Sequence, residues 1–212
     1  MTEVRDLSSA YHVCVSKDSA EEEIEQALEW GVDCLVAQGN GSDWGPNWLG
    51  DKSCHTLNRL QCKESADIII SAALKNKVPF IISMGTPTGS DAHLEEALND
   101  IDDMAREKGL NFKVAVIHSE IDKEYIKRKL EHGDRMPRVV ESPHLSEYLT
   151  MEEVDKAERI VGQMGPEPIM KALDLDVDGV FTGRALDVGI HMALPLKRGF
   201  PRALAAHMAK TI

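Results

Sequence analysis

The segment "VPFIISMGTPTGSDAHLEEALNDIDDMAREKGLNFKVAVIH", residues 78–118, carries the pattern that decides the fold. Two apolar runs within it, 78–84 and 112–118, are continuous rather than alternating, which is typical of strands buried on both faces of a parallel sheet. Between the runs, apolar residues recur at helical spacing over 91–108, and Gly109 ends the pattern. The segment therefore predicts a strand–helix–strand unit.

The same alternation continues on both sides of this unit. Further strand-like runs occupy residues 4–9, 32–38 and 177–183, and helical patterns occupy 19–31, 56–77, 122–130, 150–164 and 166–174. Regular alternation of strands and helices predicts right-handed βαβ units. We expect one α/β domain over residues 1–212, with three layers, a largely parallel sheet and helices on both faces.

Local signals predict how several helices begin. Two Ser/Thr–Glu pairs have the spacing of a capping box, namely Ser19 with Glu22 and Thr150 with Glu153. Pro166 suits the first turn of a helix.

In 56–77 the expected buried residues are Leu57, Leu60, Ile69, Ile70, Ala73 and Leu74. Residues 131–149, with prolines and a glycine, interrupt the alternation and predict a long connection.

Composition excludes several classes of protein. The chain has 212 residues, of which 42% are hydrophobic and 28% charged, as expected for a globular domain with a core. No apolar stretch is long enough for a transmembrane helix, and the charged N-terminus lacks the apolar core of a signal peptide, so we expect a cytoplasmic protein. The net charge of −12, without a basic stripe, argues against nucleic-acid binding.

Cysteine usage points to a reducing compartment. Cys14, Cys34, Cys54 and Cys62 form no CxxC pair, and we interpret them as reduced thiols, mostly packing residues. Zinc binding by Cys54, His55 and Cys62 is disfavoured, because no second metal-type pair accompanies them and structural zinc requires four ligands.

Polar residues gather where each predicted strand ends. The segments that follow the strands are "GNGSDWGP" at 39–46, "GTPTGSD" at 85–91, "HSEID" at 118–122 and "GRALD" at 183–187. In parallel α/β sheets, ligands bind beyond the carboxyl ends of the strands. The sequence therefore predicts a site for a small anionic metabolite at this edge of the sheet.

Both glycine-rich loops offer groups that bind an anion. The candidates are Asn40, Ser42 and Asp43 in the first loop, and Thr86, Thr88 and Ser90 in the second. The alternatives are a plain turn in which Asp43 caps a neighbouring amide, and Ser90 as the N-cap of helix 91–108.

The ionisable candidates follow the last two strands. His118 and Glu120 predict an acid/base pair, the alternative being a satisfied histidine at a strand end. Arg184 suits a bidentate bond to a carboxylate or phosphate, and Asp187 either orients it or caps the next helix. No phosphate-binding loop, nucleophile elbow or HExxH motif is present, so these patterns name no reaction.

Five segments together resemble the acyclic terpene utilisation (AtuA) family: "GSDWGPNWLG" at 41–50, "FKVAVIHSEIDKEYIKRKL" at 112–130, "RIVGQMGPEPIMKALD" at 159–174, "DGVFTGRALDVGIHMALPLKRGF" at 178–200 and "ALAAHMAK" at 203–210. The similarity runs from about residue 30 to the end. Gln38 stands where the family strand is expected to end in an acidic residue, and Trp44 replaces a proline.

The resemblance implies a role in the catabolism of branched acids and terpenoids. Some members of the family carry labels of methylaspartate-type ammonia-lyases. Members are generally much longer than this chain, which implies an N-terminal portion that works with a companion domain or subunit. The uncapped helix pattern at 201–212 agrees with this expectation.

We therefore expect a lyase or hydratase of carboxylic-acid catabolism that acts on a small carboxylate or acyl thioester. Arg184 and the amides of 85–90 would hold the carboxylate, while Asp43, or Glu120 with His118, would move a proton. Gln163 and Glu167 would complete the site. A divalent metal such as Mg²⁺ is a second hypothesis, with the ligands Asp43, Glu120 and Asp187.

The alternative function is a non-catalytic metabolite-binding or scaffolding subunit that needs a partner chain for activity. We also expect the protein to form a homo-oligomer, with neither nucleic-acid nor membrane partners.

Overall fold

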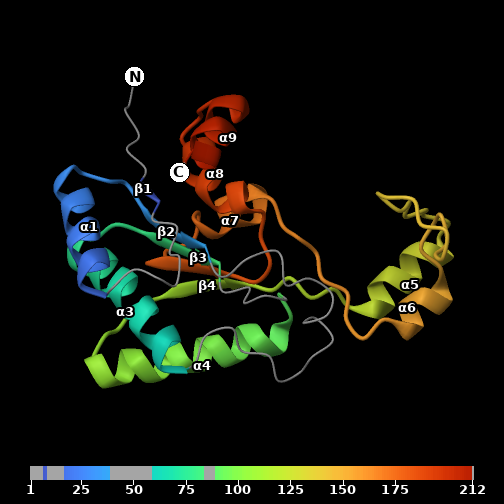
Figure 1. Ribbon diagram of the computed structural model, residues 1–212, viewed down its shortest axis with the longest axis horizontal. Coiled ribbons are helices and arrows are strands. Elements are labelled where there is room, and N and C mark those ends of the chain that lie inside the picture. The colour runs from blue at the N-terminus through green and yellow to red at the C-terminus, as the bar shows by residue number, and fades with distance from the viewer. Residues whose placement is uncertain (1–6, 9–16, 39–58, 84–88, 212) are drawn as a thin grey trace.

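The computed structural model describes residues 7–8, 17–38, 59–83 and 89–211. A five-stranded sheet lies at its centre, in the order β1-β2-β3-β5-β4 (Figure 1). The strands are β1 (Leu7–Ser8), β2 (Leu35–Gln38), β3 (Phe80–Ser83), β4 (Val114–Ile117) and β5 (Gly179–Thr182). All four strand pairings are parallel. Each strand falls inside a predicted run, and the predicted three-layer α/β fold is confirmed.

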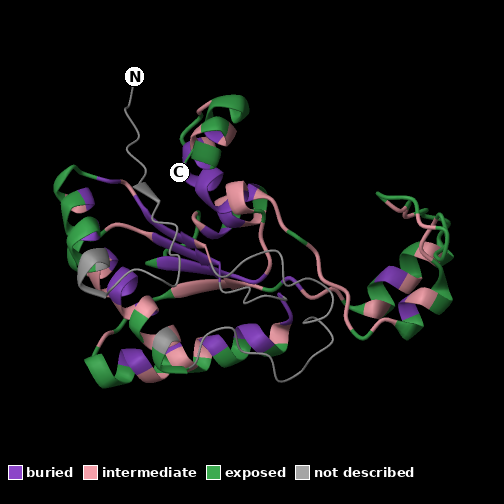
Figure 2. Ribbon diagram, viewed as in Figure 1, coloured by how far each residue is buried: buried purple, intermediate pink, exposed green. Residues whose placement is uncertain are grey.

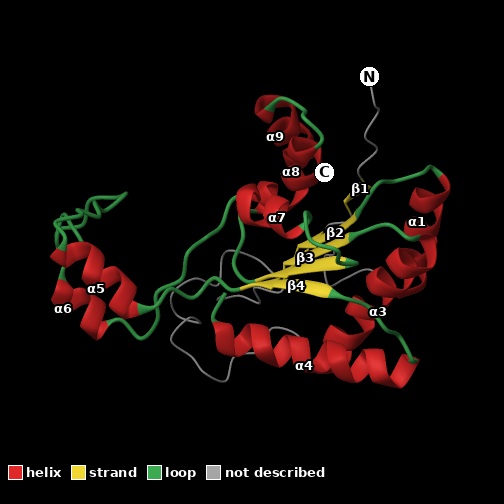
Figure 3. Cartoon of the chain, turned by 180° about the vertical axis from the view of Figure 1, so that it is seen from behind, coloured by secondary structure: helices red, strands yellow, loops and turns green. Residues whose placement is uncertain are grey.

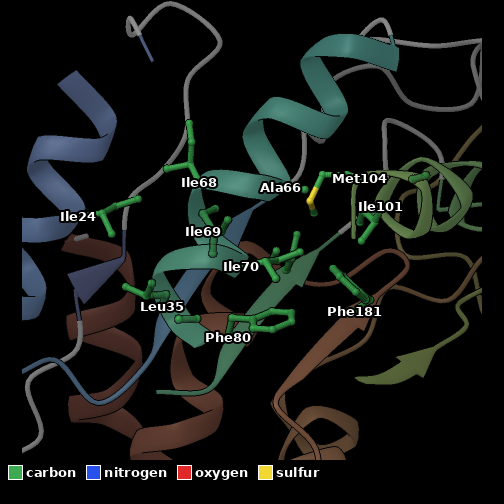
Figure 4. Close-up of a cluster of buried hydrophobic side chains, with 14 of the residues drawn as sticks. Ile24, Leu35, Ala66, Ile68, Ile69, Ile70, Phe80, Ile101, Met104 and Phe181 are labelled. Carbon is green, nitrogen blue, oxygen red and sulfur yellow. The ribbon is translucent and has the colours of Figure 1, made fainter. Parts of the chain in front are cut away.

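Three of the described helices cover the first face of the sheet: α1 (Lys17–Glu29), α3 (Arg59–Asn76) and α4 (Asp91–Lys108). Their buried side chains, such as Ile24, Ile69 and Ile101, belong to one core cluster with Phe80 and Phe181 of the sheet (Figure 4). The rings of Phe80 and Phe181 lie 5.6 Å apart, centroid to centroid. This cluster anchors the strands on which the polar edge is built.

The helices α7 (Pro166–Ala172), α8 (Asp187–Lys197) and α9 (Arg202–Thr211) form the other layer. Ile169 of α7 and Ile190 of α8 join Val36, Ile81 and Val180 of the strands in a second core cluster. The strands therefore contribute side chains alternately to the two clusters, which explains why their sequences are apolar without a break. The helix α9 packs against α8 through Ala205 and Ala209.

The order of the strands creates a topological switch point. The chain passes from β3 through α4, on the first face, to β4 at the edge. It then returns through α7, on the second face, and inserts β5 between β3 and β4. The neighbouring strands β3 and β5 are thus followed by helices on opposite faces, which is the place where open α/β sheets bind ligands.

Residues 122–159 form a separate helical extension, which we call the arm. Its helices α5 (Lys123–Glu131) and α6 (Met151–Lys156) pack against each other through buried Ile126 and Val154 and lie away from the sheet (Figure 3). The arm is joined to the domain by a short two-stranded stalk, in which the Ile121 and Gly162 amides donate 2.8 Å hydrogen bonds to the carbonyls of Ile160 and Ser119.

The arm corrects the expectation of regular strand–helix alternation. The helical pattern at 122–130 is real, but α5 does not cover the sheet, and the crossover helix between β4 and β5 is α7. Amphipathic spacing shows that a helix has a buried side without showing what buries it, and here α6 does so.

Most predicted helix ends are confirmed. Ser90 and left-handed Gly109 cap α4, α7 begins at Pro166, and Thr150 and Glu153 form the capping box of α6. The helix α1 instead begins at Lys17, so a capping box that starts at Ser19 is wrong. Leu60 is also not buried: it lies ahead of the stretch of α3 that contacts the core.

The two described cysteines behave as packing thiols. Cys34 is fully buried in the second core cluster. Burial raises the pKa of the Cys62 thiol to about 11, so it stays protonated near neutral pH. Cys14, Cys54 and His55 lie outside the described residues. Among the helices of the described residues, none is both long enough and apolar enough to cross a membrane.

Candidate functional site

The carboxyl ends of β3, β4 and β5 lie side by side. Ser83 pairs in register with Thr182, and Thr182 with Ile117. The residues that follow these ends include four of the predicted candidates: Ser90, His118, Glu120 and Arg184. Hydrogen bonds between these segments bring their backbones together at one edge of the sheet. This edge, at the carboxyl ends of the strands, is where the sequence predicts the ligand site.

Ser119 joins the three segments that follow these strands. Its Oγ donates a 2.7 Å hydrogen bond to the Gly89 carbonyl, ahead of α4, and accepts a 2.7 Å bond from the Arg184 amide, beyond β5. Its side chain is buried. Sequence reasoning missed Ser119, because its role depends on which loops meet, and that follows from the strand order.

Two glycines make this close approach feasible. Gly89 has a φ of +72°, and a Cβ there would clash with the Arg184 side chain. A Cβ at Gly183 would clash with Ser119 Oγ. The buried hydroxyls of Ser83 and Thr182 both donate to the Gly183 carbonyl, at 3.2 and 3.1 Å. The turn after β5 is therefore held by hydrogen bonds with the strand residues Ser83 and Thr182 and with Ser119.

His118 is held by carboxylates of α4. Its Nδ1 lies 3.2 Å from Asp91 Oδ1, and its Nε2 lies 3.9 Å from Glu95 Oε1. About half of the imidazole side chain, 47%, is exposed. A histidine that is oriented by a carboxylate and open to solvent can exchange protons with a bound molecule. Asp91 and Glu95 were not singled out from the sequence, although their i, i+4 spacing at the start of a helix was visible.

Glu120 binds the N-terminus of α4. Its Oε2 accepts a 2.9 Å hydrogen bond from the Asp91 amide, where the helix dipole favours an anion. Its Oε1 lies 4.0 Å from Nε of Arg159, whose side chain is almost fully buried. Glu120 and His118 therefore meet through Asp91, one at its amide and the other at its carboxylate.

Ser90 serves as the N-cap of α4, which confirms the alternative given for it. Its hydroxyl lies 2.8 Å from His93 Nδ1 and accepts a 3.4 Å bond from the His93 amide. Ser90 has no exposed surface. The helix cap therefore accounts for this serine.

Arg184 has its backbone fixed by both neighbouring segments. Its amide donates to Ser119, and its carbonyl accepts a 3.0 Å bond from the Met164 amide. The Leu186 amide donates in turn to the Met164 carbonyl at 2.9 Å. Exposed Gln163 precedes this pairing, so it lies beside the segment that carries Arg184.

Glu167 belongs to the contact between α7 and α9. Its carboxylate pairs with the Arg202 guanidinium, and this hydrogen bond lowers the pKa of Glu167. Both side chains are more than half exposed. The structure thus shows a surface ion pair at this predicted position.

Asp187 is the first residue of α8 rather than its N-cap, so that alternative is wrong. The N-cap is Leu186, which provides no side-chain hydrogen bond. Asp187 Oδ1 instead accepts a 2.6 Å bond from Gln38 Nε2, at the end of β2. The carboxylate thus bonds to a side chain of β2 and not to an amide of its own helix. Local cap signals in the sequence give no indication of such a distant partner.

The remaining candidates Asn40, Ser42, Asp43, Thr86 and Thr88 lie outside the described residues. The Mg²⁺ hypothesis includes Asp43 and therefore stays a prediction. In the part of the chain that is described, no three His, Cys, Asp or Glu residues are grouped as a metal site requires.

Comparison with known protein families gives a match. The sequence model of the acyclic terpene utilisation family protein AtuA matches residues 58–197, which include β3 to β5, the arm and α8. No curated protein and no solved structure matches the chain.

Proposed function

The chain belongs to the acyclic terpene utilisation family AtuA, and from this premise we propose that it is an enzyme of carboxylic-acid or terpenoid catabolism. The reaction is of the lyase or hydratase type, and the substrate is a small carboxylate or its acyl thioester. Such reactions remove a proton from the carbon next to a carbonyl, or add one there.

The observation that supports this proposal most is the His118–Asp91 pair. Nδ1 of the half-exposed imidazole lies 3.2 Å from the Asp91 carboxylate, beside the switch point. Asp91 holds the ring in one orientation, in which His118 would take a proton from the substrate. Proton transfer by such a positioned side chain accelerates a reaction by ~10²–10⁴-fold.

Arg184 is the proposed anchor for the substrate carboxylate. It follows β5 at the switch point, and its backbone is held on both sides by Ser119 and Met164. A guanidinium binds a carboxylate through two parallel hydrogen bonds, which fixes the orientation of the substrate. Asp43, which follows β2 in the sequence, is the second candidate for moving a proton.

The test is solvent hydrogen exchange into candidate substrates. The purified protein is incubated in D₂O with a panel of short carboxylic acids and their coenzyme A thioesters, and deuterium next to the carbonyl is followed by NMR. The expected result is catalysed exchange that His118→Asn reduces at least about 100-fold. His207→Asn, which changes an exposed histidine on α9, should exchange like the wild type.

Two results would contradict the proposal. One is no exchange with any member of the panel, and the other is equal exchange by the wild type and His118→Asn. Asp43→Asn enters the same assay, and unchanged turnover would remove Asp43 from the mechanism.

A second candidate function is a subunit that needs a partner chain for activity. The arm favours it, because Glu120 lies within the stalk, opposite Val161, and the stalk leads into Met164, which pairs with Arg184. A partner bound to the arm would therefore act on the site at short range. Assays with and without the proteins encoded by neighbouring genes distinguish the two candidates: exchange only in the mixture supports the subunit.

A further inference from the structure

The arm exposes apolar side chains at its tip. Val139 and Val140 are 99% and 74% exposed, and Leu145, in the same loop, is 53% exposed. Figure 2 shows that most of the arm is exposed and that its buried residues lie where α5 and α6 meet. Grouped apolar residues on a surface mark interaction sites, whereas single ones are ordinary.

The outer face of α5 adds an aromatic ring and positive charge to this surface. The helix contains four basic and two acidic residues. Tyr125, Arg128, Lys129 and His132 follow one another at helical spacing and are all exposed, while Ile126 faces α6. The arm therefore presents an aromatic and basic face within a chain whose net charge is −12.

The helix α1 carries the complementary surface. It contains one basic and six acidic residues. Glu22, Glu25 and Glu29 share its exposed side, and Trp30, just beyond the helix, is 55% exposed. This surface pairs acidic charge with an aromatic ring, as the arm pairs basic charge with one.

The arm and α1 lie at opposite ends of the molecule in both views (Figures 1 and 3). The two surfaces of one copy therefore do not meet, and contact between them requires a second copy. We propose that the arm of one copy binds the acidic face of α1 on another copy. Opposite charges set the partner and the orientation, while burial of the aromatic and apolar side chains stabilises the contact.

Sedimentation equilibrium of the intact protein tests this contact. At low salt the wild type should have a mass above the 23.4 kDa of one chain. Added salt should lower this mass, because exposed charges are screened. Arg128→Glu with Lys129→Glu, or Glu22→Lys with Glu25→Lys, should each weaken association by about tenfold or more, because each change opposes like charges.

Mixing the two double variants gives the decisive measurement. An acidic arm then meets a basic α1, and a basic arm meets an acidic α1, so the mixture should regain a mass above that of one chain. The matched control is Lys171→Glu with Lys210→Glu, which alters exposed lysines of α7 and α9 by the same total charge and should associate like the wild type.

The proposal is overturned by a monomeric wild type, by double variants that associate like the wild type, or by a mixture that remains monomeric. Circular dichroism of each variant confirms that its helices are retained. The readout is mass, so the result is independent of the enzymatic proposal.

Discussion

Ser119 shows how one small side chain holds the candidate site together. Its hydroxyl satisfies a buried carbonyl from one loop and a partly buried amide from another, at 2.7 Å each. The space around it is closed by Gly89 and Gly183, so a larger side chain has no room. Ser119 is therefore important because its hydroxyl lies where the two loops meet.

Ser119→Ala should therefore lower the free energy of unfolding by about 1–3 kcal/mol, because it leaves the Gly89 carbonyl and the Arg184 amide without their partner. Urea denaturation measures the change. Ser146→Ala, in the exposed loop of the arm, is the control and should stay within about 0.5 kcal/mol of the wild type. Equal stability of the two variants would rule out this role for Ser119.

Buried His191 should make the protein sensitive to acid. Burial lowers the pKa of its imidazole from 6.5 to about 4, against a smaller opposing effect of Asp187. Between these pH values the unfolded chain binds a proton that the folded chain does not, so stability falls as the pH drops below about 6.5. The loss attributable to His191 reaches up to about 3 kcal/mol near pH 4.

His191→Leu removes this titration. Urea denaturation of both proteins at pH 7 and at pH 4.5 separates its effect from that of other groups. The wild type should lose more stability between the two pH values than the variant loses. Equal losses would show that His191 does not contribute.

Sequence reasoning singled out some residues of the candidate site and missed others for a clear physical reason. His118, Glu120 and Arg184 follow strands, and the carboxyl ends of parallel strands share an edge in any strand order. Ser119 and Asp91 matter through contacts between loops, which depend on β5 lying between β3 and β4. The partner of Asp187 is 149 residues away in the sequence.

At the scale of elements, α4 and the arm show that local patterns predict where a helix begins and ends but not what it packs against. Both ends of α4 were predicted, because Ser90 and Gly109 act on amides and carbonyls a few residues away. The helix α5 was predicted as a short and more exposed helix, but its packing against α6 was not predicted. Its buried face consists mainly of Ile126, too little to indicate whether a sheet or another helix covers it.

The arm should be dispensable for folding of the domain. Ile121 and Ile160 are joined by a 2.8 Å hydrogen bond, so a short Gly–Ser linker can replace residues 122–159 without moving β4 or α7. The shortened protein should remain soluble and unfold cooperatively on heating, as followed by circular dichroism. Aggregation or loss of the cooperative transition would show that the arm supports the fold.

At the scale of the whole molecule, the resemblance to the AtuA family and the three-layer architecture were both predicted and are confirmed. Each rests on a pattern repeated along the chain: strand–helix alternation for the fold, and several motifs in order for the family. The position of β5 was not predicted, since the apolar strands look alike and nothing local states which two will be neighbours.

Binding of a small carboxylate should stabilise the entire protein. A ligand at a concentration of 100 times its Kd adds about 2.7 kcal/mol to the free energy of unfolding. A thermal-shift screen of short acids should therefore identify ligands that raise the Tm, and Arg184→Gln should abolish the rise. Arg106→Gln, which removes an exposed guanidinium from α4, is the control; an unchanged shift in Arg184→Gln would exclude Arg184 as the anchor.

The insertion of β5 has a consequence for how the protein is made. β5 follows β3 and β4 in the chain but lies between them in the sheet, so the strand that joins them is the last of the described strands to be synthesised. A nascent chain that ends before Gly179 lacks the strand that pairs with both β3 and β4. Translation must therefore pass Thr182, the last residue of β5, before β3 and β4 can be joined in one sheet. A chain that stops earlier cannot form the complete sheet.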